Sequence, residues 1–192
     1  MNKNPTDLTK SRAQWRTELI AQRRAIREEA RLIATKTISA TLSEVIQQRL
    51  ASVKTIGAYL PHRGEVDLRG WMAIVDFQQV AALALPVVVE AAMPLQFARF
   101  RIGDALVKGI HGIDIPYKRE WVIPDVLLLP CVGFTRSRLR LGYGGGYYDR
   151  TLASMQPKPL TVGIAFASQE CSINAQEHDV VMDLIITEEF VL

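Results

Sequence analysis

The chain has few cysteines and no long apolar run. Its 192 residues include only Cys131 and Cys171, which lie far apart and form no spacing typical of a metal or redox site. The longest apolar run, residues 81–89, is interrupted by a proline and is too short to span a membrane. The first 16 residues are polar and lack the apolar core of a signal peptide. We therefore expect no membrane association and a reducing, cytoplasmic environment.

The chain also lacks a strong net charge. It has 23 basic and 20 acidic side chains, a net charge of +3, which is too small for the electrostatic footprint of a nucleic-acid-binding protein. We therefore expect no nucleic-acid partner. The mild total conceals an asymmetry, because residues 1–36 hold 9 basic and 4 acidic side chains, whereas residues 168–192 hold 6 acidic side chains and no basic one.

The first 50 residues show the periodicity of helices. Apolar side chains recur at helical spacing at Trp15, Leu19, Ile26, Ala30 and Ile33. At ~100° per residue, four arginines fall within one sector beside this stripe: Arg12, Arg16, Arg23 and Arg27. Residues 38–46 continue as a second helix or as a bent extension of the first. The pattern therefore predicts a basic helix at the N-terminus.

Beyond residue 50 the pattern changes to short apolar strands. They are predicted at residues 55–60, 80–89, 95–101, 126–130, 160–166 and 184–187. Pro86 indicates an end or a bulge of the second strand. One short helix is predicted around residues 68–75 and another from about Tyr147, whereas residues 103–124 are rich in glycine and proline and are predicted as loop.

Strands that alternate with helices predict a single-domain α/β fold over residues 1–192, with a mostly parallel central sheet flanked by helices. The ligands of such sheets bind at the carboxyl ends of the strands. The loops at residues 61–65 and 133–146 both follow predicted strands, so we expect them to form the site.

Residues 140–150, with the sequence RLGYGGGYYDR, form the most informative segment. Its four glycines, after a buried strand and before a helix, are typical of a phosphate cradle, because backbone N–H groups can approach an anion closely there. Arg140 and Arg150 can add charged donors, and Asp149 can hold a Mg²⁺ ion that bridges phosphates. The segment matches neither the P-loop nor the dinucleotide-binding pattern. Tight packing of a turn is the alternative role for the glycines, and helix capping is the alternative for Asp149.

Residues 128–134 (LLPCVGF) together with residues 140–150 resemble the signature of the 5-formyltetrahydrofolate cyclo-ligase family, and the resemblance extends over most of the chain. Weaker matches follow in the family's order, namely Arg12 and Arg16 in the first helix, Leu60 and Glu65 after the first strand, and Asp183 before the last strand. The chain departs from the family's usual pattern at Thr135 (usually aspartate), Arg138 (usually glycine) and Ile115 (often glutamate).

The resemblance implies an ATP- and Mg²⁺-dependent enzyme. It would cyclise 5-formyltetrahydrofolate to 5,10-methenyltetrahydrofolate and release ADP and phosphate through an iminophosphate intermediate. Its partners would be these small molecules, and we expect a monomer.

The resemblance also implies a set of site residues. ATP would be bound by Arg12, Arg16, Arg140, Leu141, Gly142, Tyr143, Gly144, Gly145, Gly146, Tyr147 and Tyr148. The folate would contact Leu60, Glu65, Tyr143, Gly144, Gly145, Gly146 and Tyr147, with Glu65 accepting hydrogen bonds from the pterin. Arg140 and Tyr147 would be catalytic, and Asp149 and Asp183 would hold Mg²⁺.

Two other interpretations of the sequence stay open. The chain could be a catalytically diverged nucleotide- or folate-binding protein of the same fold, with Thr135 and Arg138 as the signs of divergence. It could also bind nucleic acid through the basic helix at residues 10–36, which predicts strongly salt-dependent binding but leaves the glycine segment unexplained. The histidines His62, His111 and His178 lack ligand-like spacing, and we expect them to be structural or exposed.

Overall fold

The computed structural model describes residues 10–49 and 53–192. Its helices are α1 (Arg12–Ala25), α2 (Glu28–Arg49), α3 (Arg69–Phe77) and α4 (Tyr147–Ser154), with a short 3₁₀ turn, η2 (Ala167–Gln169). Its strands are β1 (Thr55–Gly57), β2 (Ala82–Val87), β3 (Gln96–Phe100), β4 (Leu106–Lys108), β5 (Asp114–Pro116), β6 (Trp121–Val122), β7 (Val126–Pro130), β8 (Gly133–Phe134), β9 (Arg140–Leu141), β10 (Leu160–Ile164) and β11 (Leu184–Ile186).

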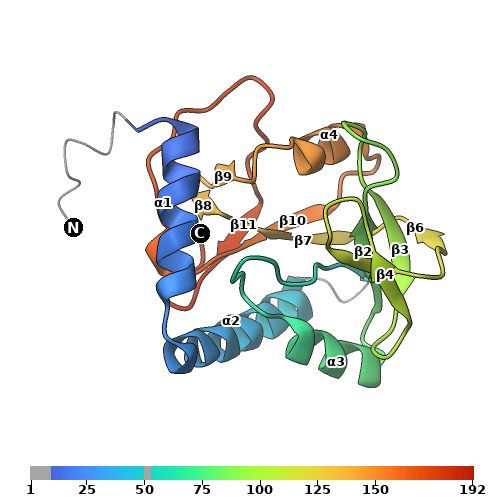
Figure 1. The fold of residues 1–192 in the computed structure, drawn as a ribbon. Helices are drawn as coiled ribbons and strands as arrows, with labels where there is room; N and C mark the ends of the chain where they lie inside the picture. Colours follow the sequence, from blue (N-terminus) through green and yellow to red (C-terminus); the bar gives the residue numbers. More distant parts are fainter. Residues whose placement is uncertain (1–9, 50–52) are drawn as a thin grey trace.

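Within these residues, seven strands form one sheet in the order β11-β10-β7-β1-β2-β3-β6. The strands from β11 to β2 are parallel, and β3 and β6 extend one edge in antiparallel fashion. The predicted α/β class with a mostly parallel sheet is therefore confirmed. Figure 1 shows α2 and α3 below the sheet, α4 above it, and α1 upright at one side.

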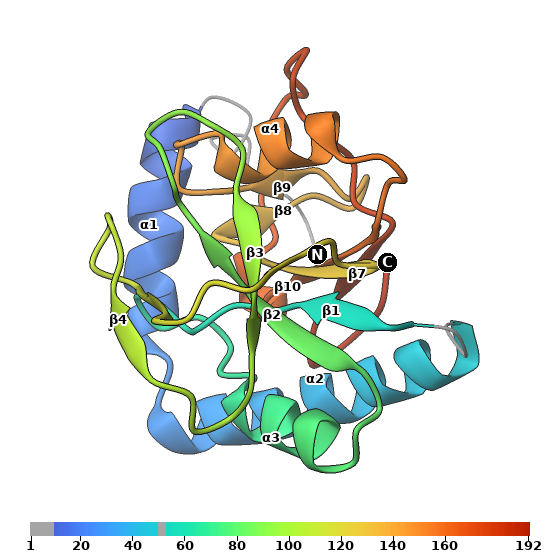
Figure 2. The same ribbon diagram turned by 90° about the vertical axis from the view of Figure 1, so that its right-hand side faces the viewer.

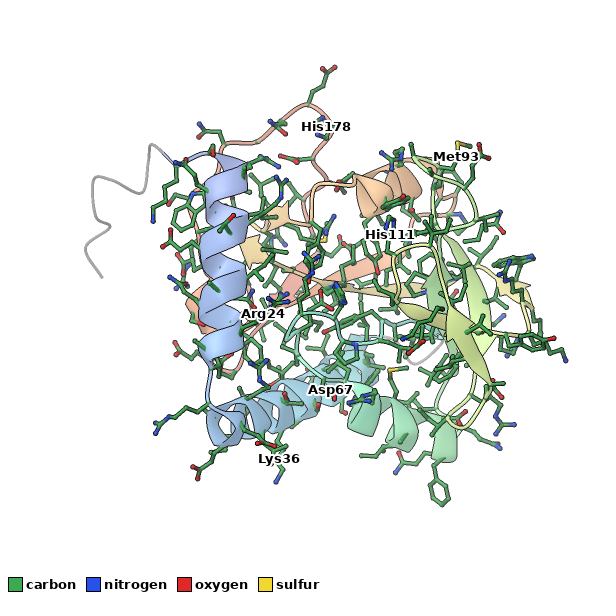
Figure 3. The ribbon with its side chains drawn as sticks, viewed as in Figure 1. Arg24, Lys36, Asp67, Met93, His111 and His178 are labelled. Atoms are coloured by element: carbon green, nitrogen blue, oxygen red, sulfur yellow. The ribbon has the colours of Figure 1, made fainter. Side chains whose placement is uncertain are left out.

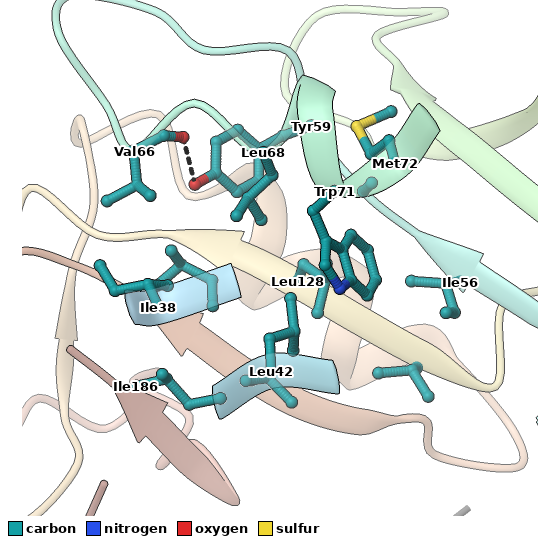
Figure 4. Packing of buried hydrophobic residues seen from close by; sticks show 14 of the residues in the cluster. Ile38, Leu42, Ile56, Tyr59, Val66, Leu68, Trp71, Met72, Leu128 and Ile186 are labelled. Carbon is teal, nitrogen blue, oxygen red and sulfur yellow. Dashed lines mark hydrogen bonds between the residues drawn. The ribbon is translucent and has the colours of Figure 1, made fainter. Parts of the chain in front are cut away.

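Strand β7 is apolar throughout because the sheet is covered on both faces. On one face Leu128 packs in a cluster with Leu42 of α2 and Trp71 of α3, as Figure 4 shows. On the other face Leu127 belongs to a cluster with Leu152 of α4. Successive residues of the strand thus serve opposite cores, which explains its unbroken apolar sequence. Among the described residues, no helix combines the length and the apolar character that crossing a membrane requires.

Helix α1 begins at a capping box and ends where the chain becomes extended. The Ser11 side chain accepts a hydrogen bond from the backbone N–H of Gln14, and the Gln14 side chain accepts one from the N–H of Ser11. Ile26 has a ψ of 123°, so the helix stops before it and α2 begins at Glu28. The predicted apolar stripe is therefore interrupted, and Ile33 is exposed.

Pro86 is the penultimate residue of β2, so the strand ends beside it, as the sequence predicts, and its pairing with β3 continues there without a bulge. It pairs with Phe97 of β3, whereas β1 pairs only with residues 82–84 of β2. The backbone oxygen of Ala84 accepts a hydrogen bond from the N–H of Ala58, so the backbone groups of Ala84 face β1. Residues two apart in a strand direct their backbone groups to the same side, so those of Pro86 also face β1. Strand β1 has already ended there, and the N–H that proline lacks would have no ladder partner.

Residues 103–124, predicted as loop, contain a hairpin in which β4 pairs with β5, and they also contain β6. All three residues of β4 are exposed, so no alternation of apolar and polar residues marks this strand in the sequence. Figure 2 shows β4 standing away from the main sheet, toward the side on which α1 lies. The hairpin tip closes with a hydrogen bond of 2.9 Å from Gly109 N–H to the oxygen of Ile113.

Two departures from the family pattern fall in the hairpin formed by β8 and β9. The Thr135 hydroxyl accepts a hydrogen bond of 3.1 Å from the N–H of Leu139, so it stabilises the turn. Arg138 has a φ of +65°, a left-handed conformation that favours the glycine usual at this position. Its guanidinium donates to the backbone oxygen of Asp183 at 2.7 Å. Both residues therefore have local roles in the hairpin.

Candidate active site

A cavity of about 650 Å³ lies at the carboxyl ends of β1, β2 and β7. Its walls are α1, the loop after β1, the β4–β5 hairpin, residues 142–149, and part of the segment between η2 and β11. The loops at 61–65 and 133–146, which the sequence predicts at this edge, both contribute residues to it. The position agrees with the rule that α/β sheets bind ligands outside the carboxyl ends of their strands.

The glycine loop, residues 142–146, turns the chain from β9 into α4. Gly144 has a φ of +95° and Gly146, the N-cap of α4, a φ of +64°, conformations that other residues rarely adopt. A Cβ atom on Gly144 would also lie 3.2 Å from the guanidinium carbon of Arg16. The first residues of α4 line the cavity. The free backbone N–H groups of this helix end and the positive end of its dipole are therefore available to an anion in the cavity.

Four arginines line the cavity, namely Arg12, Arg16, Arg63 and Arg140. Arg16 donates from Nε to the backbone oxygen of Gly142 at 2.8 Å. Arg12 forms a two-pronged ion pair with Asp179. Arg140 is 8% exposed and donates to Asp149 at 3.2 Å, while its Nε is buried without a hydrogen-bond partner among the described residues. The four guanidinium groups give the cavity the positive charge that binding of a polyanion requires.

Asp179 is the acidic partner that sequence reasoning missed. Burial disfavours its charged form, but the hydrogen bonds from Arg12 and from the N–H of Gln176 outweigh that effect and lower its pKa. Asp179 belongs to the acidic C-terminal segment that composition reveals, but no local pattern distinguishes it from the other five acidic residues there.

Glu65 is buried, with 4% of its surface exposed. Its Oε2 accepts a hydrogen bond of 2.9 Å from the N–H of His62, and its Oε1 accepts one of 2.8 Å from the hydroxyl of Tyr143. Burial raises the pKa of the carboxyl group, and these two hydrogen bonds together with Arg23 and Arg140 partly oppose the rise. The predicted binding carboxylate therefore lies in the cavity with donors already directed at it.

Arg23, one of the four arginines in the sector beside the apolar stripe of α1, lies in the interior. It is 0% exposed and donates to the backbone oxygens of Cys131 at 3.0 Å and Arg63 at 3.2 Å, and to the Tyr143 hydroxyl at 2.7 Å. Arg23 therefore differs from Arg12 and Arg16 of the same helical sector, whose side chains line the cavity. Its position next to the apolar stripe of α1 was the only local signal of burial.

The structure separates the two predicted metal ligands. Asp149 is the third residue of α4 and lines the cavity, and because Gly146 is the N-cap, Asp149 does not cap the helix. Asp183 lies at the amino ends of β10 and β11, where its Oδ2 accepts hydrogen bonds from the N–H and the hydroxyl of Thr161 at 2.8 and 2.7 Å. Asp183 therefore joins two strands at the opposite edge of the sheet, and the metal role predicted for it has no structural support.

Tyr147 and Leu60 line the cavity as predicted. The Tyr147 hydroxyl is 3.1 Å from Nε2 of His111, which comes from the tip of the β4–β5 hairpin. Figure 3 labels His111 close to α4 and His178 on the outer loop, and both also line the cavity. His111 and His178 are exposed, as expected, and all three histidines, His62 included, line the cavity. Within the described residues no three His, Cys, Asp or Glu side chains are grouped to hold a metal ion.

The fold and the cavity define an α/β protein with a glycine loop suited to phosphates and a buried carboxylate in one pocket. A family model of the 5-formyltetrahydrofolate cyclo-ligase family matches residues 8–188. The chain belongs to this family.

Individual relatives agree over nearly the whole length. The chain is 30% identical to the 5-formyltetrahydrofolate cyclo-ligase of Mycolicibacterium smegmatis, covering 93% of this chain and 94% of the relative. The enzyme of that name from Haemophilus influenzae is also 30% identical, with 88% and 93% covered. The NMR structure of Aquifex aeolicus 5,10-methenyltetrahydrofolate synthetase has a TM-score of 0.80 at 28% identity, covering 94% of this chain and 91% of that one.

Membership of the family has direct consequences for activity. It makes the chain a ligase that acts on folate in one-carbon metabolism, and it implies cyclisation of 5-formyltetrahydrofolate to 5,10-methenyltetrahydrofolate with the use of ATP. The family resemblance seen in residues 128–134 and 140–150 is thereby confirmed.

Proposed function

We propose that the cavity between α1, the glycine loop and the β4–β5 hairpin binds ATP and 5-formyltetrahydrofolate together and releases ADP, phosphate and the methenyl product. The observation that carries this proposal is that the glycine loop, four arginines and the buried carboxylate of Glu65 line a single cavity. Phosphate ligands and a carboxylate that can read N–H donors are the two features that the two substrates require.

The reaction is difficult because the carbon of the formyl group on N5 is a poor electrophile. The formyl group on N5 is an amide, and its oxygen is a poor leaving group. Transfer of the γ-phosphoryl group to that oxygen forms an O–P bond, breaks the bond to ADP and gives an iminophosphate. N10 then attacks the activated carbon, loses its proton, and phosphate departs with the C–O bond as the ring closes. Both steps require positioning and charge stabilisation from the protein.

The phosphate end of the site is the arginine side. Backbone N–H groups of the glycine loop, with Arg12 and Arg16 from α1, hold the triphosphate. Arg140 stabilises the negative charge that moves onto ADP, since it is nearly buried and has an Nε without a partner among the described residues. In this arrangement Arg12 exchanges its contact with Asp179 for phosphate oxygens.

The folate end of the site is the side of Glu65. Its carboxylate accepts hydrogen bonds from the pterin ring, which carries adjacent N–H donors. Leu60 and Tyr147 supply the apolar and aromatic walls, and Ile115 of the hairpin, 6% exposed, extends them. The hydroxyl of Tyr147, near His111, faces the reacting groups from the hairpin side.

A Mg²⁺ ion fits this donor set through Asp149. Magnesium commonly binds one or two carboxylates and takes its other ligands from substrate phosphates and water. Asp149 supplies such a carboxylate at the start of α4, and its 3.2 Å contact with Arg140 is at the long end of hydrogen-bond distances. When bound, the ion neutralises phosphate charge and orients the phosphate oxygens.

Turnover by the purified protein tests the proposal. Protein, ATP, Mg²⁺ and 5-formyltetrahydrofolate are mixed, and the ultraviolet absorbance of 5,10-methenyltetrahydrofolate is followed, with a matched reaction lacking ATP as control. We expect product only when ATP is present, in a one-to-one ratio with ADP. If no product forms at high protein concentration while calorimetry shows intact nucleotide binding, the proposed catalysis is rejected and the chain is a diverged binding protein.

A further inference from the structure

Tyr143 links three parts of the molecule that lie far apart in the sequence. It stands between Gly142 and Gly144 in the glycine loop, yet its hydroxyl reaches the loop after β1. There it lies 2.8 Å from Oε1 of Glu65, and 2.7 Å from Nη2 of Arg23 in α1. A tyrosine in a phosphate loop would not need such contacts if it only packed against a nucleotide.

The donors and acceptors of this chain are determined by chemistry. Arg23 can only donate, so the Tyr143 oxygen accepts from it and the single phenolic proton is left for Glu65. The backbone oxygen of His62 is also near, but at 3.4 Å it is the weaker acceptor. Arg23 is itself held by the backbone oxygens of Cys131 and Arg63, so the orientation of the hydroxyl is imposed from the interior.

The two carboxylate oxygens of Glu65 are therefore held from two different loops, one from the glycine loop and the other from the loop after β1 that contains Glu65 itself. The N–H of His62 holds Oε2, and Tyr143 holds Oε1. The remaining lone pairs of the carboxylate point in a direction that these two bonds determine. A carboxylate in a buried site without such donors would rotate and would more readily take up a proton.

We propose that Tyr143 is a positioning residue for the folate: its hydroxyl, oriented by buried Arg23, holds Glu65 in the ionised and correctly rotated form that reads the pterin. This inference rests on the proposed function of Glu65 and extends it. It also means that the loop that holds the phosphates and the carboxylate that holds the folate are joined by one hydrogen bond.

Several ionisable groups besides Tyr143 interact electrostatically with the carboxyl group of Glu65. They are Arg23 of α1, Arg140 of β9, Tyr148 of α4, Tyr59 after β1 and Cys131 after β7. Of these only the two arginines favour the charged carboxylate, and phenylalanine at position 143 leaves both in place. The substitution Tyr143→Phe therefore removes one donor that lowers the pKa of Glu65 and changes no formal charge.

The test compares Tyr143→Phe with Tyr117→Phe, a tyrosine that is 71% exposed and does not line the cavity. Loss of one hydrogen bond to a charged group predicts a rise of about 10- to 100-fold in KM for 5-formyltetrahydrofolate, while KM for ATP stays near the wild-type value. The acid limb of the pH profile of kcat/KM for the folate should move to higher pH, because Glu65 without this donor protonates at higher pH. Tyr117→Phe should reproduce the wild-type profile.

Glu65→Gln completes a double-mutant cycle. Adding Tyr143→Phe to Glu65→Gln should change KM for the folate far less than it does in the wild-type background, because the group that Tyr143 positions has lost its charge. Thermal unfolding of each variant checks that the fold is retained. Wild-type protein without turnover would reject the proposed function itself. Active wild-type protein whose Tyr143→Phe variant keeps its pH profile, or loses affinity for ATP and folate equally, would reject this inference.

Discussion

Replacing Arg140 with methionine should abolish most of the activity and leave stability nearly unchanged. Arg140 is almost fully buried, donates to Asp149 at 3.2 Å, and stacks over the ring of Tyr148 at 5.2 Å. Its Nε has no hydrogen-bond partner among the described residues. A buried charge held this loosely is poorly explained by a role in folding, and well explained by a role in binding phosphate.

The contributions to stability nearly cancel. A buried donor without a partner costs ~1–3 kcal/mol, which the substitution relieves. The ion pair with Asp149, whose own side chain is 23% exposed and stays in contact with water in the variant, contributes about 1 kcal/mol or less, and the contact with the Tyr148 ring about 0.5–1 kcal/mol. Arg140→Met should therefore change the free energy of unfolding by no more than about 1–2 kcal/mol in either direction. Loss of one positioned donor should lower kcat/KM for ATP by about 10²- to 10³-fold.

Urea unfolding and steady-state turnover measure the two effects on the same preparations. Arg99→Met is the matched control, since Arg99 pairs with Glu120 at the surface at 2.8 Å and does not line the cavity. This control should lose little stability and no activity. If Arg140→Met unfolds much more easily than the control, or keeps kcat/KM within a few-fold of wild type, then Arg140 is a structural residue and our reasoning is wrong.

Three further substitutions test other parts of the site. Asp149→Asn should raise the Mg²⁺ concentration that gives half-maximal turnover about 10- to 100-fold, with the free energy of unfolding in urea changed by less than about 1 kcal/mol. Glu65→Gln should raise KM for the folate about 10- to 100-fold. Burial raises the pKa of Glu65, and the carboxylate binds the folate only when it is ionised. The acid limb of the wild-type pH profile of kcat/KM should therefore lie above the ordinary glutamate range, and it should disappear in this variant. Gly144→Ala places a side chain at a φ of +95° and 3.2 Å from the guanidinium carbon of Arg16, so it should cost ~1–2 kcal/mol of stability and raise KM for ATP.

For each of these three substitutions, one result would contradict the prediction. Equal losses of stability and of Mg²⁺-dependent turnover in Asp149→Asn would favour a purely structural carboxylate. A Glu65→Gln variant that retains the wild-type acid limb would assign that limb to another group. For Gly144, the control is Gly70→Ala in α3, where a Cβ meets nothing within 4 Å. If both alanine variants behave alike in KM for ATP, the conformation of the glycine loop does not matter for nucleotide binding.

Much of the fold follows from local patterns. The apolar run of β7 and the start of α4 at Tyr147 are where the sequence predicts them, because burial on both faces and the change from glycine to helix-forming residues leave local traces. The β4–β5 hairpin leaves none, since β4 is exposed along its length. Pro86 marks the nearby end of β2 as predicted, but the reason the sheet tolerates it is that β1 ends before this point, which is not a property of β2.

The site shows the same division. Glycines, arginines and tyrosines in residues 140–150 single out from the sequence alone the loop that we propose to bind phosphate, and this loop does line the cavity, because the pattern is carried by adjacent residues. The choice between Asp179 and Asp183 in the acidic C-terminal segment could not be made that way. One pairs with Arg12 and the other with Thr161, and both partners are distant in the chain.

Sequence patterns were enough for the α/β class, for the family to which the chain belongs and for the proposal that the glycine loop binds phosphate. Three features became visible in the folded chain alone: Arg23 is buried, Asp179 rather than Asp183 reaches the cavity, and Tyr143 joins Glu65 to the glycine loop. The physical reason is that a helix, a strand or a phosphate loop is specified by residues close together in the chain. A buried charge is specified by its partners, which here come from residues 63, 131 and 143 for Arg23.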